Sequence, residues 1–255
     1  MPLFLAAGTV GDAAPTEVVD AAVAAGFAGV GLRLDPTAVG DRAIAAIRSR
    51  LDATGMRLLD VEVVRLNAAH PAGSHRRLVE IAAELGARWV LTVSELDNRG
   101  QATDQLTELC ETAHPYGLGV ALEFMPFTEV RTLGQALELL AAVGRPNLGV
   151  LVDALHLHRS GGDRSQLATI PNGRLAYAQL CDAPNRAPAP GALAEEARHA
   201  RLMPGDGELD LVGFVAALPA GVPVSVEVQS DELTARLDPV GRARLAARTG
   251  ARFVD

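Results

Sequence analysis

The segment GLGVALEFMPFTEVRTLGQALELLAAVGRPNLGVLVD, residues 117–153, shows the unit from which the fold can be inferred. The apolar runs at 117–124 and 148–153 are typical of buried strands, and residues 131–144 between them have the spacing of an amphipathic helix. A strand, a helix and a second strand of these lengths predict a parallel pair of strands joined by a helical crossover.

The same alternation extends along the chain. Further strands are expected at 4–8, 26–34, 57–64, 87–94, 174–180 and 222–228, and further helices at 41–55, 74–86, 101–116 and from about residue 232 onward. Eight strands in 255 residues match the size of a (β/α)8 barrel. The competing architecture, an open doubly wound sheet, usually carries a glycine-rich fingerprint after its first strand, and this chain has none there. We therefore predict one TIM-barrel domain spanning residues 1–255.

The composition narrows the function classes. The formal net charge of -8 argues against a nucleic-acid partner, because an acidic surface repels the phosphate backbone. No apolar run approaches the roughly 18 residues of a membrane span, so no membrane association is expected. The chain has 2 cysteines and no basic region before its first apolar run, which favours a soluble protein in the reducing cytoplasm.

The chain contains no lysine, so all 23 of its basic residues are arginine. Schiff-base catalysis needs a lysine amine, and the phosphate-binding P-loop needs a lysine in its motif. Both kinds of chemistry are excluded by the sequence alone.

Four consecutive predicted strands end on side chains that carry oxygen, and these are Glu123, Asp153, Gln179 and Glu227. Active sites of TIM barrels lie at the C-terminal ends of the strands. Buried carboxylates that converge there must be neutralised, and without lysine only arginine or a metal ion can do so. An all-oxygen ligand set favours Mn²⁺, Mg²⁺ or Co²⁺ over a zinc site built from cysteine and histidine.

The three carboxylates also have structural interpretations. Asp153 could cap the helix that follows its strand, and the two glutamates could form ion pairs with nearby arginines. His156, on the segment after Asp153, could face a substrate or cap a loop.

Other residues could line the same end of the barrel. Glu62 and Arg65 end the third strand, and Glu62 is expected inside the barrel because a helix-facing carboxylate would lack partners. Asp182 could support the metal site or shape a turn. It begins a long segment rich in proline and alanine, 182–204, which is expected to be a binding loop.

Several motifs together resemble the xylose isomerase-like TIM-barrel superfamily, the sugar phosphate isomerase/epimerase group. The motifs are ALEFMPF, VLVDALHLHRSGGD, YAQLCDAP, RLMPGDGELDL and VSVEVQS, in the order of that family. The resemblance implies one divalent metal ion held by Glu123, Asp153, Gln179 and Glu227. Many members have histidine at the position of Gln179, whereas hydroxypyruvate isomerase-like members and some 3-dehydroshikimate dehydratases have glutamine.

The activity that the resemblance implies is a sugar, sugar phosphate or keto-polyol isomerase or epimerase. Proton transfer next to a carbonyl would pass through a metal-bound enediolate, with Glu123 and Glu227 moving the proton and His156 bonding a substrate oxygen. Further contacts to the substrate are expected from Arg201, Glu62, Arg65 and Asp182.

Two alternatives stay open. A dehydratase begins with the same proton abstraction and then expels a β-hydroxyl group, so a lyase of the 3-dehydroshikimate dehydratase type is the second enzyme hypothesis. A non-catalytic domain that binds a metal or a sugar acid belongs to a different class, although the complete ligand set argues against it. Barrels of this kind often pair, so a homodimer is a further alternative, but the sequence itself does not define the oligomeric state.

Overall fold

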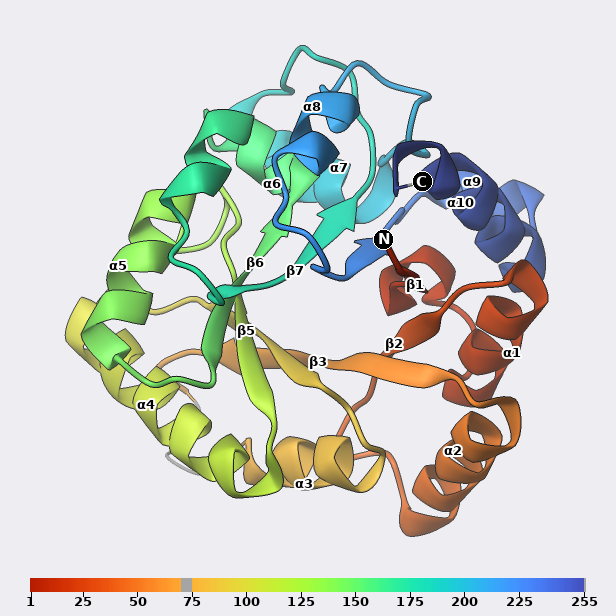
Figure 1. The fold of residues 1–255 in the computed structure, drawn as a ribbon, viewed down its shortest axis with the longest axis horizontal. Coiled ribbons are helices and arrows are strands. Elements are labelled where there is room, and N and C mark those ends of the chain that lie inside the picture. Colours follow the sequence, from red (N-terminus) through yellow and green to blue (C-terminus); the bar gives the residue numbers. More distant parts are fainter. Residues whose placement is uncertain (70–74, 255) are drawn as a thin grey trace.

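The computed structural model describes residues 1–69 and 75–254, and it forms a closed barrel of eight parallel strands that follow one another in chain order (Figure 1). The strands are β1 (Leu3–Leu5), β2 (Gly29–Arg33), β3 (Arg57–Leu66), β4 (Trp89–Ser94), β5 (Gly119–Glu123), β6 (Leu148–Asp153), β7 (Leu175–Leu180) and β8 (Val224–Val226). Strand β8 pairs with β1 and closes the ring. The predicted (β/α)8 barrel is confirmed.

Helices surround the barrel on its outer side (Figure 1). They are α1 (Pro15–Ala25), α2 (Asp41–Thr54), α3 (Arg76–Glu84), α4 (Arg99–Ala113), α5 (Leu133–Val143), α6 (Ala154–Arg159), α7 (Leu193–His199), α8 (Leu211–Ala216), α9 (Asp231–Arg236) and α10 (Pro239–Val254). Short 3₁₀ segments are η1 (Ala7–Val10), η2 (His114–Tyr116), η3 (Arg164–Thr169) and η4 (Pro190–Ala192). In the described part of the chain, no helix has the length and apolar character needed to cross a membrane.

The first strand is shorter than predicted, because the chain turns into η1 after Leu5. The Thr9 hydroxyl donates to the carbonyl of Val226 and accepts from the amide of Val228, both at 2.9 Å. These two bonds tie η1 to the end of β8, so residues 7–10 fold across the barrel end instead of extending the strand.

Other boundaries also differ from the expectations. The predicted C-terminal helix is two helices, since Pro239 lacks the amide hydrogen that a continuous helix would need and instead begins α10. The expected helix at 74–86 is α3, with Ser74 outside the described residues. The expected loop at 182–204 contains η4 and α7.

Two apolar layers hold the barrel together. Alternate residues of each strand point to opposite faces, so neighbours such as Val150 and Leu151 enter different layers. The larger layer lies between the strands and the helices. The smaller layer fills the barrel interior and contains Phe4, Leu59, Leu91, Val93, Ala121, Met125, Leu151, Ala176 and Tyr177. Each large buried side chain contributes about 1.5–3 kcal/mol to folding.

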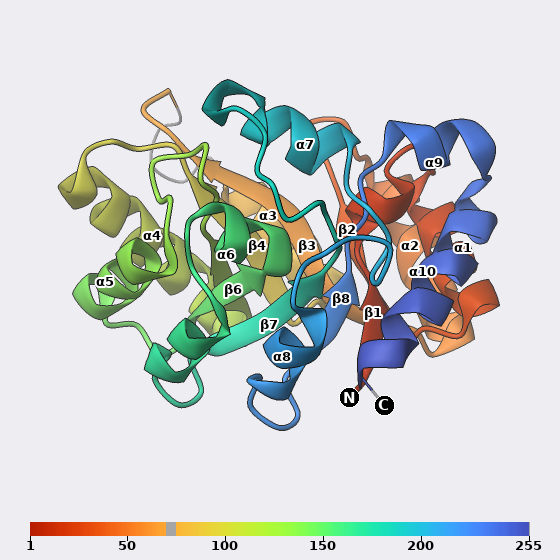
Figure 2. The same ribbon diagram turned by 90° about the horizontal axis from the view of Figure 1, so that it is seen from above.

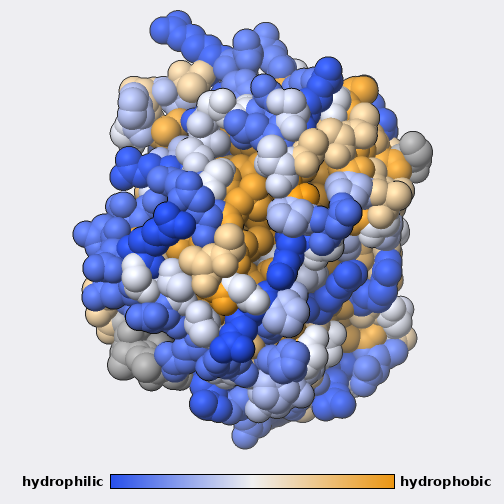
Figure 3. All heavy atoms as spheres, turned by 60° about the vertical axis from the view of Figure 1, so that its left-hand side comes forward, coloured by the Kyte–Doolittle hydropathy of each residue, from blue (hydrophilic) through white to orange (hydrophobic). Residues whose placement is uncertain are grey.

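The two ends of the barrel differ. Figure 2 shows α7 and α9 over one end of the barrel and both termini at the other. Since α7 belongs to the segment that follows β7, it lies at the C-terminal ends of the strands. The face drawn in Figure 3 is mostly hydrophilic, with a strip of hydrophobic residues recessed within it.

Candidate metal centre

The strand order and register bring the four predicted metal ligands to the C-terminal end of the barrel. Asp153 ends β6 and lies in register with Gln179 on β7. Gln179 lies in register with Ser225 on β8, two residues before Glu227. Residues two apart on a strand point to the same face, so Ser225 and Glu227 share the orientation of Gln179. Glu123 ends β5, the strand on the other side of β6.

Three of these side chains converge on one small volume. One carboxylate oxygen each of Glu123, Asp153 and Glu227 lies within 4.8 Å of the other two. The three residues are 6%, 1% and 5% exposed. Divalent ions bind oxygen at about 2.0–2.6 Å, which places ligands on opposite sides of an ion roughly 4–5 Å apart. The spacing therefore suits a single divalent cation.

Gln179 supplies independent support for an ion in this place. Its side chain is 1% exposed, and among the described residues its Oε1 atom has no hydrogen-bond partner. Leaving a buried amide oxygen unpaired costs about 1–3 kcal/mol. A cation bound by the neighbouring carboxylates would give this oxygen a partner, so the donor set fits a divalent metal.

The electrostatics of the cluster point the same way. Burial, together with the nearby charges of Glu227 and Asp153, raises the pKa of Glu123 well above its usual value. Burial raises the pKa of Glu227 to about 7 despite the favourable charge of Arg201. Both shifts mean that the ionised carboxylates lack enough positive charge around them, which a divalent ion would supply.

Arg201 is the cation that the chain itself places in this cluster. Its Nη1 donates to Asp153 Oδ2 at 2.6 Å, its Nη2 lies 3.5 Å from Glu227 Oε2, and its Nε donates to the Ala197 carbonyl at 2.7 Å. Burial alone would raise the pKa of Asp153, but the contact with Arg201 outweighs it and the pKa is lowered. The sequence analysis expected Arg201 to contact substrate, and the structure pairs it with Asp153, one of the candidate metal ligands.

His156 lies between the carboxylates. Its backbone amide donates to Asp153 Oδ1 at 3.0 Å, so Asp153 does cap α6, as its structural interpretation predicted. The His156 Nε2 atom is 3.4 Å from Arg201 Nη2 and 3.8 Å from Glu123 Oε1. Burial lowers the pKa of His156 to about 4, which keeps the imidazole neutral near pH 7. Its Nδ1 is buried and has no hydrogen-bond partner among the described residues.

A pocket of about 360 Å³ opens beside this cluster. Its lining residues are Arg33, Glu62, Val63, Arg65, Leu91, Val93, Glu123, Met125, Phe127, His156, Ala197, Arg198, Arg201, Glu227 and Gln229. Glu62 and Arg65 line it, and Glu62 forms an ion pair with Arg33 at 2.9 Å. Arg198 and Phe127 are pocket residues that the sequence did not single out, because their place depends on how the chain folds over the barrel end.

Asp182 lies away from this lining and holds the loop that carries Arg201. Its Oδ1 accepts from the amides of Ala183 and Leu209 at 2.9 and 3.0 Å, and its Oδ2 accepts from the amide of Gly205 at 2.9 Å. A reciprocal pair of backbone bonds joins Asp182 to Leu202, next to Arg201. Asp182 thus fixes both ends of the segment that covers the site.

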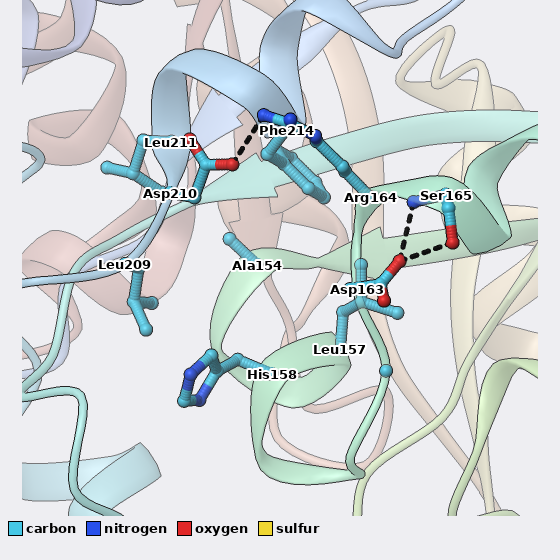
Figure 4. A pocket seen from close by; sticks show the side chains of 11 residues that line it. Ala154, Leu157, His158, Asp163, Arg164, Ser165, Leu209, Asp210, Leu211 and Phe214 are labelled. Atoms are coloured by element: carbon cyan, nitrogen blue, oxygen red, sulfur yellow. Dashed lines mark hydrogen bonds and ion pairs between the residues drawn. The ribbon is translucent and has the colours of Figure 1, made fainter.

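A second pocket, of about 390 Å³, lies beside α6, η3 and α8 (Figure 4). Its floor is apolar, and its polar side chains are engaged with one another: Arg164 pairs with Asp210 at 2.6 Å, and Asp163 accepts from Ser165. No metal ligand predicted from the sequence lines it. Of these two pockets, the one at the strand ends contains the candidate metal ligands Glu123 and Glu227.

The chain is thus a TIM barrel with a cluster of buried carboxylates at the C-terminal ends of its strands, where a divalent metal ion could bind. The xylose isomerase-like TIM barrel family model matches residues 19–254, and the chain belongs to that family.

Similar proteins carry several activities. The chain is 33% identical over 164 residues to a 3-dehydroshikimate dehydratase of Pseudomonas aeruginosa, a match that covers 61% of this chain and 25% of that protein. It is 40% identical over 115 residues to an inosose isomerase of Halalkalibacterium halodurans, covering 44% of this chain and 39% of the relative. The chain thus matches a quarter to two fifths of the length of these relatives.

Solved structures agree on the fold. A structure described as the IOLI protein with a binding zinc atom superposes with a TM-score of 0.86 at 22% identity, over 100% of this chain and 98% of that one. At 22% identity, this similarity shows a shared fold and nothing further.

Proposed function

We propose that the protein is a divalent-metal-dependent isomerase or epimerase that transfers a proton next to the carbonyl of a small sugar-like substrate. The observation that carries the proposal is the convergence of Glu123, Asp153 and Glu227, with oxygens within 4.8 Å of one another, beside a pocket of about 360 Å³. Such a pocket is large enough for a substrate of about six carbons.

Glu123, Asp153, Gln179 and Glu227 would hold the metal ion. When bound, a divalent ion polarises a carbonyl oxygen and stabilises the negative charge that develops when the neighbouring C–H bond is broken.

Glu227 and Glu123 would move the proton. Both line the pocket, where Glu123 ends β5 and Glu227 directly follows β8. A bound metal ion would keep both glutamates ionised, which is the state in which a carboxylate can take a proton from carbon. One glutamate would remove the proton from carbon and the other would return it.

His156 and Arg201 would orient the substrate. The neutral imidazole of His156 lines the pocket and can donate or accept one hydrogen bond to a substrate hydroxyl. Arg201 also lines the pocket, and its guanidinium already donates to Asp153. It would therefore bond the substrate and Asp153 at the same time. The ion pair of Glu62 with Arg33 forms another polar part of the wall.

A dehydratase is the second candidate, and a specific observation supports it. The match to the Pseudomonas aeruginosa 3-dehydroshikimate dehydratase covers 61% of the chain, slightly more than the 56% covered by an inosose isomerase of Bacillus velezensis. In a dehydratase the same glutamate would remove the proton, and a β-hydroxyl group would then leave instead of a proton returning.

The experiment that separates these activities follows the proton. Protein supplied in turn with Mn²⁺, Mg²⁺, Co²⁺ or Zn²⁺ is incubated with inosose in D₂O, and with 3-dehydroshikimate in a spectrophotometer. Deuterium incorporation next to the carbonyl, seen by NMR, marks an isomerase or epimerase, whereas loss of water with a new ultraviolet chromophore marks a dehydratase. Metal binding without either reaction across a panel of ketoses would identify a binding domain and contradict the proposal.

A matched pair of variants connects the activity with the site. Glu227→Gln should lower turnover by about 10²–10⁴-fold, the range of general acid-base catalysis. Glu129→Gln makes the same change on an exposed side chain of the loop after β5, outside the pocket lining, and should leave turnover unchanged. Full activity in Glu227→Gln would show that this glutamate does not move the proton.

A further inference from the structure

The wall of the pocket is unusually rich in arginine. Arg33, Arg65, Arg198 and Arg201 line it, against three carboxylates. Asp153, bonded to Arg201 behind this lining, balances the fourth positive charge. Glu95, which pairs with Arg65, is a fifth carboxylate beside these four arginines, so a divalent ion held as described above would leave the site positively charged by about one unit. A substrate with one negative charge would restore neutrality.

Three of these arginines already have carboxylate partners. Arg33 pairs with Glu62 at 2.9 Å, Arg65 pairs with Glu95 at 3.2 Å, and Arg201 pairs with Asp153. The Arg65–Glu95 pair is more than two fifths exposed on both sides, so it is weak and can be exchanged for another anion.

Arg198 differs from the other three arginines. Among the described residues no carboxylate pairs with it, and its guanidinium lies over the ring of Phe127 at 5.5 Å from the centroid. Phe127 in turn meets the His156 ring edge-on, with centroids 5.5 Å apart. The stacking contact positions an unpaired cation at the pocket, on the helix α7 that covers this end of the barrel (Figure 2).

From this arrangement we propose that the pocket binds a polyol carrying one anionic group, a carboxylate or a phosphate, and that Arg198 and Arg65 hold this group. The proposal rests on the metal-dependent function proposed above and names its substrate class. A planar guanidinium group can donate two parallel hydrogen bonds to a carboxylate or a phosphate. The neutral hydroxyl groups of an uncharged sugar offer neither this geometry nor the negative charge. Arg198 is therefore a specificity-determining residue that sequence inspection does not reveal.

The test compares three ring polyols by titration calorimetry against Mn²⁺-loaded protein at low salt. The probes are quinate, which carries a carboxylate, myo-inositol 1-phosphate, which carries a phosphate, and uncharged myo-inositol. At least one anionic probe should bind about tenfold or more tightly than myo-inositol, and the tighter of the two identifies the group. The preference should weaken as the salt concentration rises.

Variants test which arginines cause the preference for an anionic probe. Arg198→Gln should reduce the preference for the anionic probe about tenfold, and Arg65→Gln should reduce it further in the double variant. Arg99→Gln is the matched control, because Arg99 begins α4 at the same end of the barrel but pairs with Glu138 and lies outside the pocket lining. Arg198 is exposed, so its replacement should leave the fold intact.

The outcomes distinguish this inference from the function on which it rests. Failure of Mn²⁺ to bind would overturn the proposed function. If Mn²⁺ binds, three results would overturn the anionic-substrate inference alone. These are equal affinity for charged and uncharged probes, no binding of any probe, and an unchanged preference in Arg198→Gln.

Discussion

Arg201 Nη1 lies 2.6 Å from Asp153 Oδ2, and both residues are at most 2% exposed. The pair spans 48 residues of sequence and joins the segment over the barrel end to the metal ligand at the end of β6. A buried pair of this kind is costly to break, because one charge is then left without a partner. The arginine therefore links the integrity of the metal site to the position of the covering segment.

Replacing this arginine should destabilise the metal-free protein. Arg201→Met leaves Asp153 and Glu227 without their cation and should lower the free energy of unfolding by about 3–5 kcal/mol at pH 8, measured in urea. Mn²⁺ should restore part of the loss by supplying positive charge. Arg164→Met, which breaks an exposed pair with Asp210, should cost at most about 1 kcal/mol. Equal losses in the two variants would contradict the role given to Arg201.

Gly8 keeps space for the carboxylate of Glu227. A Cβ atom at Gly8 would lie 2.5 Å from Glu227 Oε1, so Gly8→Ala must push this carboxylate aside. We expect metal affinity to fall at least tenfold while thermal stability changes little, because the displaced atoms belong to flexible side-chain ends. Gly11→Ala meets only ordinary contacts of 3.7–3.9 Å and is the control. Normal metal affinity in Gly8→Ala would place Glu227 outside the ligand set.

Gly207 allows the covering segment to close on Asp182. A Cβ atom there would lie 2.4 Å from Asp182 Oδ1 and 2.5 Å from the Ala183 carbonyl, so Gly207→Ala must move backbone. Since this segment carries Arg201, the variant should lower both stability and turnover. Gly191→Ala changes the same segment where a Cβ has open space, and it should behave as the wild type. Comparable thermal melts and rates for the two variants would argue against Asp182 as the anchor.

Metal affinity should depend on pH around neutrality. Burial raises the pKa of Glu227 to about 7 and raises that of Glu123 well above its usual value, so protons compete with the metal and affinity should rise with pH through about 7. Calorimetric titration with Mg²⁺ between pH 6 and 8.5 measures the slope. An affinity independent of pH over this interval would mean that Glu227 does not bind the ion.

The raised pKa of Glu227 should also make the stability of the metal-free protein fall as pH rises, whereas it makes the metal affinity rise. A folded-state pKa above the ordinary 4.5 means that the Glu227 contribution to stability is complete below pH 4.5 and is lost as pH rises through about 7. His156, with its pKa lowered to about 4, reduces stability only as pH falls below about 6.5. Urea unfolding from pH 6.5 to 8 therefore isolates the carboxylate contribution, and bound metal should remove the decline.

The sequence predicted most of the fold because strands buried on both faces are strongly apolar and the helices between them are amphipathic. Residues 148–153 agree with β6 at both ends. The helix α1 was not anticipated, because its buried face consists largely of small alanine and valine side chains that give little contrast. The turn after Leu5 could not be predicted either, since it depends on bonds from Thr9 to strand β8, more than 200 residues away.

The candidate metal ligands could be proposed from the sequence because each is a polar residue at or near the end of an apolar strand. Residues whose role depends on tertiary contacts were harder to assign. Asp182 was expected to touch substrate, whereas the structure shows its oxygens engaged by backbone amides of its own loop. Arg198 was not considered, because nothing in the local sequence indicates that α7 folds back over Phe127.

The central claim is that one divalent ion binds among Glu123, Asp153, Gln179 and Glu227, and Mn²⁺ binding followed by electron paramagnetic resonance tests it most directly. Metal-free wild-type protein and Glu129→Gln should each take up one tightly bound Mn²⁺ per chain, whereas Glu123→Gln should lose at least 100-fold in affinity. Equal Mn²⁺ binding by Glu123→Gln and the wild type, or no tight binding by the wild type, would contradict the account.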